Sequence, residues 1–302
     1  MLVLNTLINI LEQGMCYAIV ALGVYISYKI LDFPDLSVDG TFPLGASVAV
    51  MLINSGVHFS LAMLVAIVCG GFFGLITGIL CVKCRISSLL SGILTMTALL
   101  SINLVISGGK VIVSIKGDTL FDNSFTRLFS EELKPLAIIM IMLFIVVVMK
   151  IILDLFIKTK CGLILRATGD NEGIVSLLGK NAGNYKILGL VIANAFVAFA
   201  GSMYSQVMRY FDNTSGTGMV VIALASVIIG SAIFKKVSFV KGTTSSIIGA
   251  IIYTACMNII IAIGLPSIYL KLVMAILFAI ILVLNNFIGG KLSIGKIMRR
   301  VK

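Results

Sequence analysis

The sequence predicts an all-α membrane protein, a polytopic helix bundle with about eight to ten transmembrane helices, some of them broken or half-length. Hydrophobic residues make up 60% of the 302 residues and charged residues only 12%, about half the charged fraction of a soluble domain. Apolar runs of the length that crosses a bilayer recur along the whole chain. Basic residues lie at the ends of these runs. We therefore expect one transmembrane domain over residues 1–302.

Nine apolar segments account for this prediction. The second and seventh are too short to cross a bilayer alone, so we expect half-helices there. The third carries Gly70, Gly74 and Gly78, a spacing that favours close helix packing. Lys150 and Asp154, four residues apart in the fifth, are expected to pair. The nine segments are 7–28, 41–53, 61–82, 86–107, 135–157, 187–207, 219–234, 242–265 and 267–287.

The basic residues predict the orientation. If the polar interval 158–186 and the tail 289–302 are cytoplasmic and the segments alternate, 17 of the 23 basic residues fall on the cytoplasmic side. This asymmetry is typical of inner-membrane proteins. It places the N-terminus outside and the C-terminus inside. The net charge of +11 then reflects topology in the lipid bilayer, and we expect no nucleic-acid partner.

Motifs for catalysis or metal binding are missing from the sequence. His58 is the only histidine, and Cys81 and Cys84 form a CxxC without a second pair. Gly179-Lys180 resembles part of a phosphate-binding loop, but Ile174 and Asn181 replace the required Gly and Ser/Thr. We expect a protein that is not an enzyme, hydrolyses no ATP itself and carries no cofactor or metal.

The interval 158–186 is the longest polar stretch between two long apolar runs. Asp170 or Asn171 is suited to cap a short amphipathic helix over about 172–178. Such a helix on the cytoplasmic side could hold a soluble partner. The alternative is an ordinary cytoplasmic loop that follows the positive-inside rule.

Each short apolar run follows a polar, glycine-containing stretch, Asp35–Gly40 in the first half of the chain and Thr214–Gly218 in the second. Paired interrupted segments of this kind point to a central pathway in transporters. Pro34 and Pro43 are expected to break a helix. The first stretch is either a gate at membrane depth or a cytoplasmic turn in which Asp39 caps the following helix.

Asparagines on the apolar segments have two interpretations as well. Asn103 and Asn194 lie within predicted spans. Most intramembrane asparagines hold helices together through hydrogen bonds, whereas some line a transport pathway. The sequence leaves both open.

Three stretches carry a family resemblance: DFPDLSVDGTFPLGASVAV, GLILRATGDNEGIVSLLGKN and GTGMVVIALASVIIGSAIF. They resemble the permease subunits of bacterial ABC importers, in the superfamily of branched-chain amino acid and ribose permeases. The resemblance covers nearly the whole chain. The first stretch looks like a branch associated with tryptophan or tyrosine uptake.

The resemblance implies roles for particular residues. The interval 162–181 would contain the helix that couples to an ATP-binding subunit, with the family pattern at Arg166, Ala167, Gly169, Asp170, Asn171 and Glu172. The translocation pathway would be bordered by Asp35, Ser37, Asp39, Thr41 and the run that contains Gly216 and Gly218. Asn103 and Asn194 are our further candidates for that pathway.

The resemblance also implies partners and a substrate class. Two ATP-binding cassette subunits, an extracytoplasmic solute-binding lipoprotein and a second permease subunit are expected, the last as a homodimer or a heterodimer. Alternating access would move a small polar solute inward, an aromatic or branched-chain amino acid first, a sugar or nucleoside as the alternative. An ion-coupled secondary transporter is the competing class, but it would be expected to carry paired carboxylates or a histidine relay deep in its spans.

Overall fold

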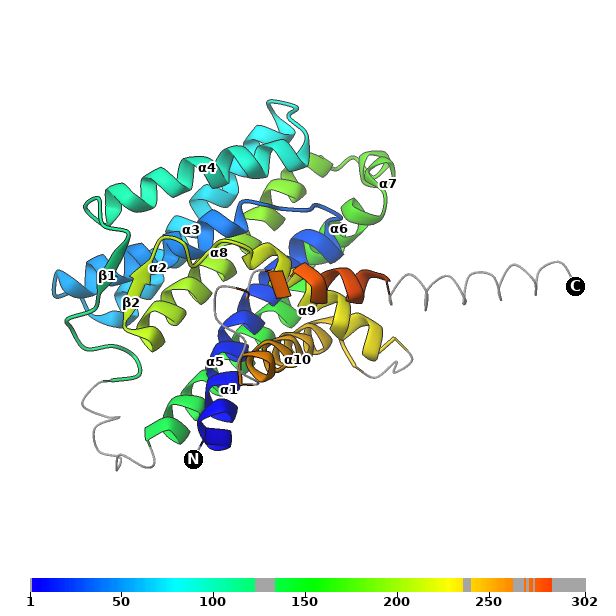
Figure 1. Cartoon of the computed structure of the whole chain (residues 1–302). Coiled ribbons are helices and arrows are strands. Elements are labelled where there is room, and N and C mark those ends of the chain that lie inside the picture. The colour runs from blue at the N-terminus through cyan, green and yellow to red at the C-terminus, as the bar shows by residue number, and fades with distance from the viewer. Residues whose placement is uncertain are drawn as a thin grey trace, which may run out of the picture.

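The computed structural model describes residues 2–122, 134–235, 240–262, 269, 272–273 and 275–283. Helices dominate these residues, as predicted (Figure 1). One pair of short strands, β1 (Ile112–Ser114) and β2 (Tyr210–Asp212), forms an antiparallel ribbon. The helices are α1 (Leu2–Val24), continued by the π-helical turn η1 (Tyr25–Ile30), α2 (Val38–Asn54), α3 (Phe59–Val82), α4 (Ser88–Ile106), α5 (Lys134–Lys158), α6 (Lys160–Asp170), α7 (Glu172–Leu177), α8 (Ala182–Met208), α9 (Met219–Ile233) and α10 (Gly242–Ala262).

Among the described residues, six helices are long and apolar enough to cross a membrane: α1 with η1, α3, α4, α5, α8 and α10. Two more, α2 and α9, are apolar but shorter. This confirms the expected multi-pass bundle with two short helices. Part of the ninth expected segment, 267–287, and the whole basic tail, 289–302, lie outside the described residues.

The glycine seam of α3 packs against α8. A Cβ atom added at Gly70 or Gly74 would meet the α8 backbone at Asn194 or Leu190, and one at Gly78 would lie 3.0 Å from the Cα of Ile187. Side chains of any size would separate the two helices, so glycine permits their close approach. The predicted seam is confirmed.

Pro43 does not break α2, contrary to the expectation from the sequence. It is the sixth residue of a helix that begins at Val38. The missing N–H and the proline ring affect the carbonyl four residues earlier, which is that of Asp39 in the first turn. The backbone of Gly216 packs against this carbonyl and against the Pro43 ring. The disturbance therefore falls at the helix start, where α2 meets the segment before α9.

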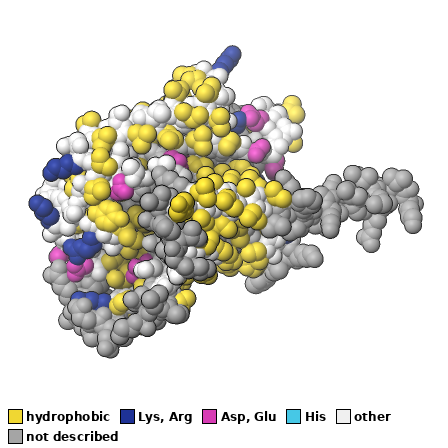
Figure 2. Space-filling model, viewed as in Figure 1, with side chains coloured by type: hydrophobic (Ala, Val, Ile, Leu, Met, Phe, Trp, Pro, Cys, Tyr) yellow, Lys and Arg dark blue, Asp and Glu magenta, His cyan; other side chains and the backbone are white. Residues whose placement is uncertain are grey.

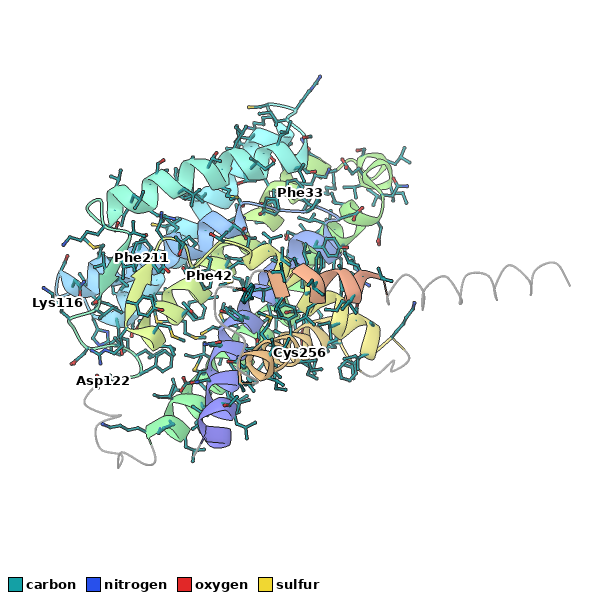
Figure 3. All side chains as sticks on the ribbon, in the orientation of Figure 1. Phe33, Phe42, Lys116, Asp122, Phe211 and Cys256 are labelled. Atoms are coloured by element: carbon teal, nitrogen blue, oxygen red, sulfur yellow. The ribbon has the colours of Figure 1, made fainter. Side chains whose placement is uncertain are left out.

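The β1–β2 ribbon and the α6–α7 segment lie at opposite ends of the bundle (Figure 1). Asn54, at the end of α2, binds the β1 strand: its Nδ2 donates to the carbonyl of Ser114 and its Oδ1 accepts from the N–H of Lys116. Asp122 and Arg209 form an ion pair at the same end (Figure 3). These contacts tie the loop after α4 to the ends of α2 and α8.

The predicted Lys150–Asp154 pair is confirmed, with 3.0 Å between Nζ and Oδ2. Asp154 also accepts from Lys241 Nζ at 3.0 Å and from Thr243 Oγ1 at 2.6 Å. The carboxylate therefore links the end of α5 to the start of α10, a connection that local sequence spacing does not reveal.

Candidate functional site

The predicted pathway residues come together where α2, α4, α8 and the segment before α9 meet. Asn194 on α8 is the centre of the first group. Its Nδ2 donates to Asp35 Oδ2 at 2.8 Å, and its Oδ1 accepts from Thr41 Oγ1 at 2.8 Å and Ser37 Oγ at 3.1 Å. Asp35 Oδ1 in turn accepts from the Ser37 hydroxyl and N–H. Each of these four residues is at most 4% exposed.

Helix geometry places this group near mid-membrane depth. Asn194 lies 12 residues from the first residue of α8 and 14 from the last, so about 18 Å and 21 Å of helix extend to either side at 1.5 Å per residue. The segment between η1 and α2 therefore enters the membrane and begins α2 there. Irregular backbone at this depth is tolerated because it is buried in protein. This disfavours the interpretation of Asp35–Gly40 as a cytoplasmic turn.

Asp39 does not cap its own helix. It lies in the first turn of α2, and its carboxylate accepts from the N–H groups of Gly218 at 3.0 Å and Val220 at 2.8 Å. Gly218, which has φ +88°, is the N-cap position of α9. A carboxylate satisfies the free N–H groups and the positive end of a helix. Asp39 thus joins the start of α2 to the start of α9.

Asn103 on α4 completes the assembly. It is fully buried, and its Nδ2 donates to the Gly40 carbonyl at 3.2 Å. Its Oδ1 has no hydrogen-bond partner among the described residues. Gly92 on the same helix approaches the backbone of Leu36, where an added Cβ would lie 2.8 Å from the amide nitrogen. Asn103 and Gly92 of α4 therefore lie against the start of α2 and the segment before it.

All eight predicted pathway residues therefore belong to one mid-membrane assembly, which we call the polar joint: Asp35, Ser37, Asp39, Thr41, Asn103, Asn194, Gly216 and Gly218. The two interrupted segments meet in it. Six of these residues are buried, whereas Asp39 and Gly218 are partly exposed. That its residues border a translocation pathway remains a prediction.

The predicted capped helix in the interval 158–186 is confirmed as α7. Asn171 is its N-cap, and its Oδ1 accepts from the Gly173 N–H at 2.9 Å. Val175 is the buried apolar residue of this short helix. Three apolar side chains at its exposed face are open to solvent: Ile174 at 54%, Leu177 at 89% and Leu178 at 68%. A helix with this much exposed apolar surface has an incomplete set of packing partners.

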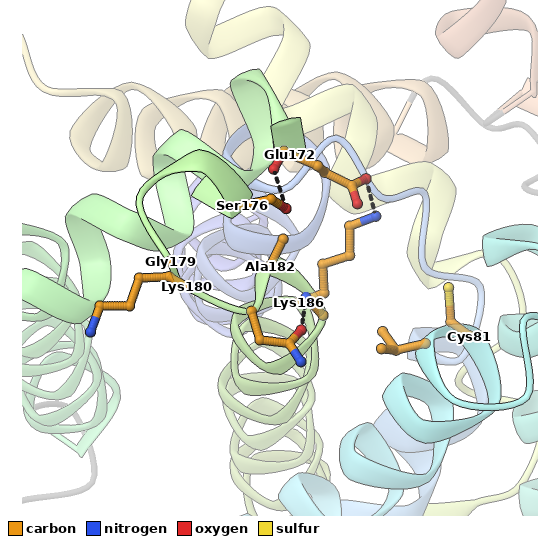
Figure 4. A pocket seen from close by; sticks show the side chains of 10 residues that line it. Cys81, Glu172, Ser176, Gly179, Lys180, Ala182 and Lys186 are labelled. Carbon is orange, nitrogen blue, oxygen red and sulfur yellow. Dashed lines mark hydrogen bonds and ion pairs between the residues drawn. The ribbon is translucent and has the colours of Figure 1, made fainter. Parts of the chain in front are cut away.

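Two hollows flank α7. One, of about 640 Å³, is lined by residues that include Ser176, Lys180 and Ala182. The other, of about 540 Å³, is lined by residues that include Asp32, Asp170 and Asn171. Glu172 and Lys186 line both and form an ion pair (Figure 4). The pair connects the start of α7 to α8.

The six predicted coupling residues do not form one surface. Asp170, Asn171 and Glu172 are exposed beside α7. Gly169 packs against the carbonyl of Ile30 at the end of η1, where a Cβ would clash. Arg166 lines a separate cavity between α5, α6 and α10, and Ala167 is partly buried. These residues are neighbours in the sequence, but successive positions of a helix point in different directions, so their side chains lie in different surroundings.

Comparison with known proteins identifies the family of this chain. Residues 6–284 match the family described as branched-chain amino acid transport system permease component. The chain is 43% identical, over 94% of its length and 92% of the relative's, to a tyrosine transport system permease protein of Clostridioides difficile. It is 25% identical to a ribose import permease protein of Haemophilus influenzae, over 95% and 87% of the two chains. No solved structure matches. The chain therefore belongs to the branched-chain amino acid transport system permease family of ABC-type membrane transporters.

Proposed function

We propose that this permease carries an amino acid with an aromatic side chain into the cell, as part of an ABC importer. Support comes from the 43% identical relative named as a tyrosine permease, which aligns over almost the whole of both chains. The ribose permease is a more distant relative, so a sugar is the second candidate. The ATP-binding cassette subunits and an extracytoplasmic binding lipoprotein supply energy and substrate. Two copies of this chain form the transmembrane unit, with their N-termini outside and C-termini in the cytoplasm.

The surface around α7 is our proposed contact with the ATP-binding subunit. It combines exposed Asp170, Asn171 and Glu172 with the exposed apolar side chains of α7. A hydrophobic centre surrounded by polar groups is the usual composition of a protein interface. α6 contacts η1 through Gly169, so a force on this surface reaches the segment that enters the polar joint.

The substrate class is tested by uptake into proteoliposomes that contain the permease, its ATPase subunit and its binding lipoprotein. We expect ATP-dependent accumulation of labelled tyrosine, which excess unlabelled phenylalanine or tryptophan reduces and ribose does not. Competition by ribose alone would support the sugar alternative. Accumulation that follows an ion gradient without ATP would refute the ABC mechanism.

The coupling surface is tested by co-purification of the ATPase subunit. Leu177→Asp places a charge at the most exposed apolar position of α7 and should reduce ATPase retention at least about tenfold, as for the loss of an interface anchor. Ile112→Asp, at an exposed apolar position of β1 at the opposite end, is the matched control and should retain the ATPase. Equal retention in both variants would reject this surface.

A further inference from the structure

A third cavity, of about 250 Å³, lies near the cytoplasmic end of α5. It is lined by Tyr25, Asp154, Ile157, Lys158, Arg166, Lys241, Gly242 and Thr243. These residues come from η1, α5, α6 and the start of α10, so four separate parts of the chain form its wall. The surface around α7, the proposed coupling contact, has other lining residues.

The cavity has an excess of positive charge. Asp154 is its one carboxylate, and Lys150, Lys241 and Thr243 already occupy that carboxylate's oxygens. Lys158 and Arg166 form no ion pair or hydrogen bond with another described residue through their charged groups. Three basic side chains, those of Lys158, Arg166 and Lys241, line the cavity with one carboxylate, so two positive charges remain. Lys158 and Arg166 are free to meet an anion, and a guanidinium suits a phosphate well.

An apolar stripe on α5 leads to this cavity. Ile151, Leu155 and Lys158 are spaced four and three residues apart and therefore share one face of the helix. Ile151 is 49% exposed and Leu155 is 60% exposed. Hydrophobic side chains spread widely over the face of the molecule that Figure 2 shows. On α5, only 17% of the most apolar 18-residue stretch is buried. This helix therefore presents a membrane-facing surface that ends in a lysine.

We propose that the cavity binds the headgroup of an anionic phospholipid from the inner leaflet. Arg166 and Lys158 contact the lipid phosphate, the Tyr25 hydroxyl lies beside it at Gly242, and one acyl chain follows the Ile151–Leu155 stripe. Basic pockets between transmembrane helices on the cytoplasmic side are suited to such headgroups. The continuous apolar stripe distinguishes a lipid from free phosphate, because a soluble anion gains nothing from exposed aliphatic side chains.

The lipid bound here would join α5, α6 and α10 at one point. Without an anion, the repulsion between the positive charges of Lys158 and Arg166 has no negative partner among the described residues to offset it, because Lys150 and Lys241 already pair with Asp154. With it, the ends of these helices share one negative partner. The proposal concerns the stability and lipid preference of the permease and holds whatever its transported substrate is.

Native mass spectrometry of the purified full-length chain tests this proposal directly. The chain is equilibrated with equal amounts of phosphatidylglycerol and phosphatidylcholine, and retained lipids are counted. We expect wild type to retain phosphatidylglycerol preferentially. Lys158→Gln with Arg166→Gln should lower that preference roughly fivefold per side chain, about twenty-fivefold together. The control, Lys160→Gln with Lys180→Gln, removes two exposed basic side chains outside the cavity and should keep the preference.

Thermal unfolding of wild type provides a second measurement that needs no variant. Phosphatidylglycerol should raise the unfolding temperature more than phosphatidylcholine, and glycerol phosphate at the same concentration should have no effect. Equal loss of lipid from both double variants would reject the cavity in favour of general surface charge. Stabilisation by glycerol phosphate alone would identify a soluble-anion site, and the absence of any preference for the anionic lipid would refute the proposal.

Discussion

Replacement of Asn194 by alanine tests whether the polar joint holds the two half-helices in place. The asparagine makes four hydrogen bonds, to Asp35, Ser37, Thr41 and the carbonyl of Leu190. All of its side-chain partners lie on the segment that begins α2. The Asn194→Ala substitution removes the side-chain hydrogen bonds of Asn194 to this segment and inserts no new group.

The cost follows from which partners lose their last hydrogen bond. The Ser37 hydroxyl still donates to Asp35 Oδ1 at 2.6 Å, and that of Thr41 still donates to the Ser37 carbonyl at 3.0 Å. Asp35 Oδ2 retains no other partner among the described residues. A buried hydrogen bond to a charged group contributes about 1.5–3 kcal/mol, and the two neutral bonds add about 0.6 kcal/mol each in a membrane protein. We expect a loss of about 3 kcal/mol in the free energy of unfolding.

Asn103→Ala is the matched control, since both asparagines are fully buried on transmembrane helices. Asn103 makes one side-chain hydrogen bond, and its Oδ1 is already without a partner. Its loss should cost about 1 kcal/mol or less. Unfolding in mixed micelles with increasing dodecyl sulfate measures both variants.

A double-mutant cycle isolates the Asp35–Asn194 contact. Asp35→Asn keeps the shape of the side chain and removes the charge, so the cost of Asn194→Ala should fall by about 1 kcal/mol or more in that background. A coupling energy near zero, or an Asn194→Ala cost no larger than that of Asn103→Ala, would refute the view that a charged hydrogen bond holds the joint.

Three further predictions concern the helix ends, the packing and the topology. Asp39→Ala should destabilise the protein by about 1–2 kcal/mol because α9 loses its carboxylate cap, and sensitivity of the α9 start to proteolysis in detergent should rise; an unchanged α9 would contradict this role. Gly74→Ala should reduce the folded yield strongly because the new Cβ clashes with the α8 backbone, whereas Gly71→Ala, with its nearest neighbour at 3.5 Å, should be tolerated. A cysteine at Asn184 should react with a membrane-impermeant thiol reagent only in inside-out vesicles, and labelling in intact cells would reverse the proposed orientation.

Much of the fold could be predicted from the sequence because a bilayer imposes simple rules on composition. The span lengths follow from its thickness, and the short runs at 41–53 and 219–234 correspond to α2 and α9. The α3 seam was evident because only glycine allows helices so close together. These features depend on local patterns, which a single sequence shows directly.

The site was less predictable because its contacts join residues far apart in the chain. Asp39 was a credible cap for its own helix, yet it caps α9, 179 residues away at Gly218. Nothing local to Asp154 indicates Lys241 or Thr243 as partners. The local effect of Pro43 predicts a helix break, but the helix tolerates this proline because it lies in the first turns of α2.

Only a few residues of the chain separate the contact between α6 and η1 from the polar joint. Gly169 rests against the carbonyl of Ile30, and Asp35 follows only five residues later. Asp35 is bound to Asn194, and Asp39 is bound to the start of α9. A movement of α6 is therefore applied to the short segment that anchors both half-helices, without passing through a full-length transmembrane helix. Packed segments of this kind transmit small displacements because they deform little. A glycine is needed where α6 meets η1 because a Cβ at position 169 would clash with the carbonyl of Ile30.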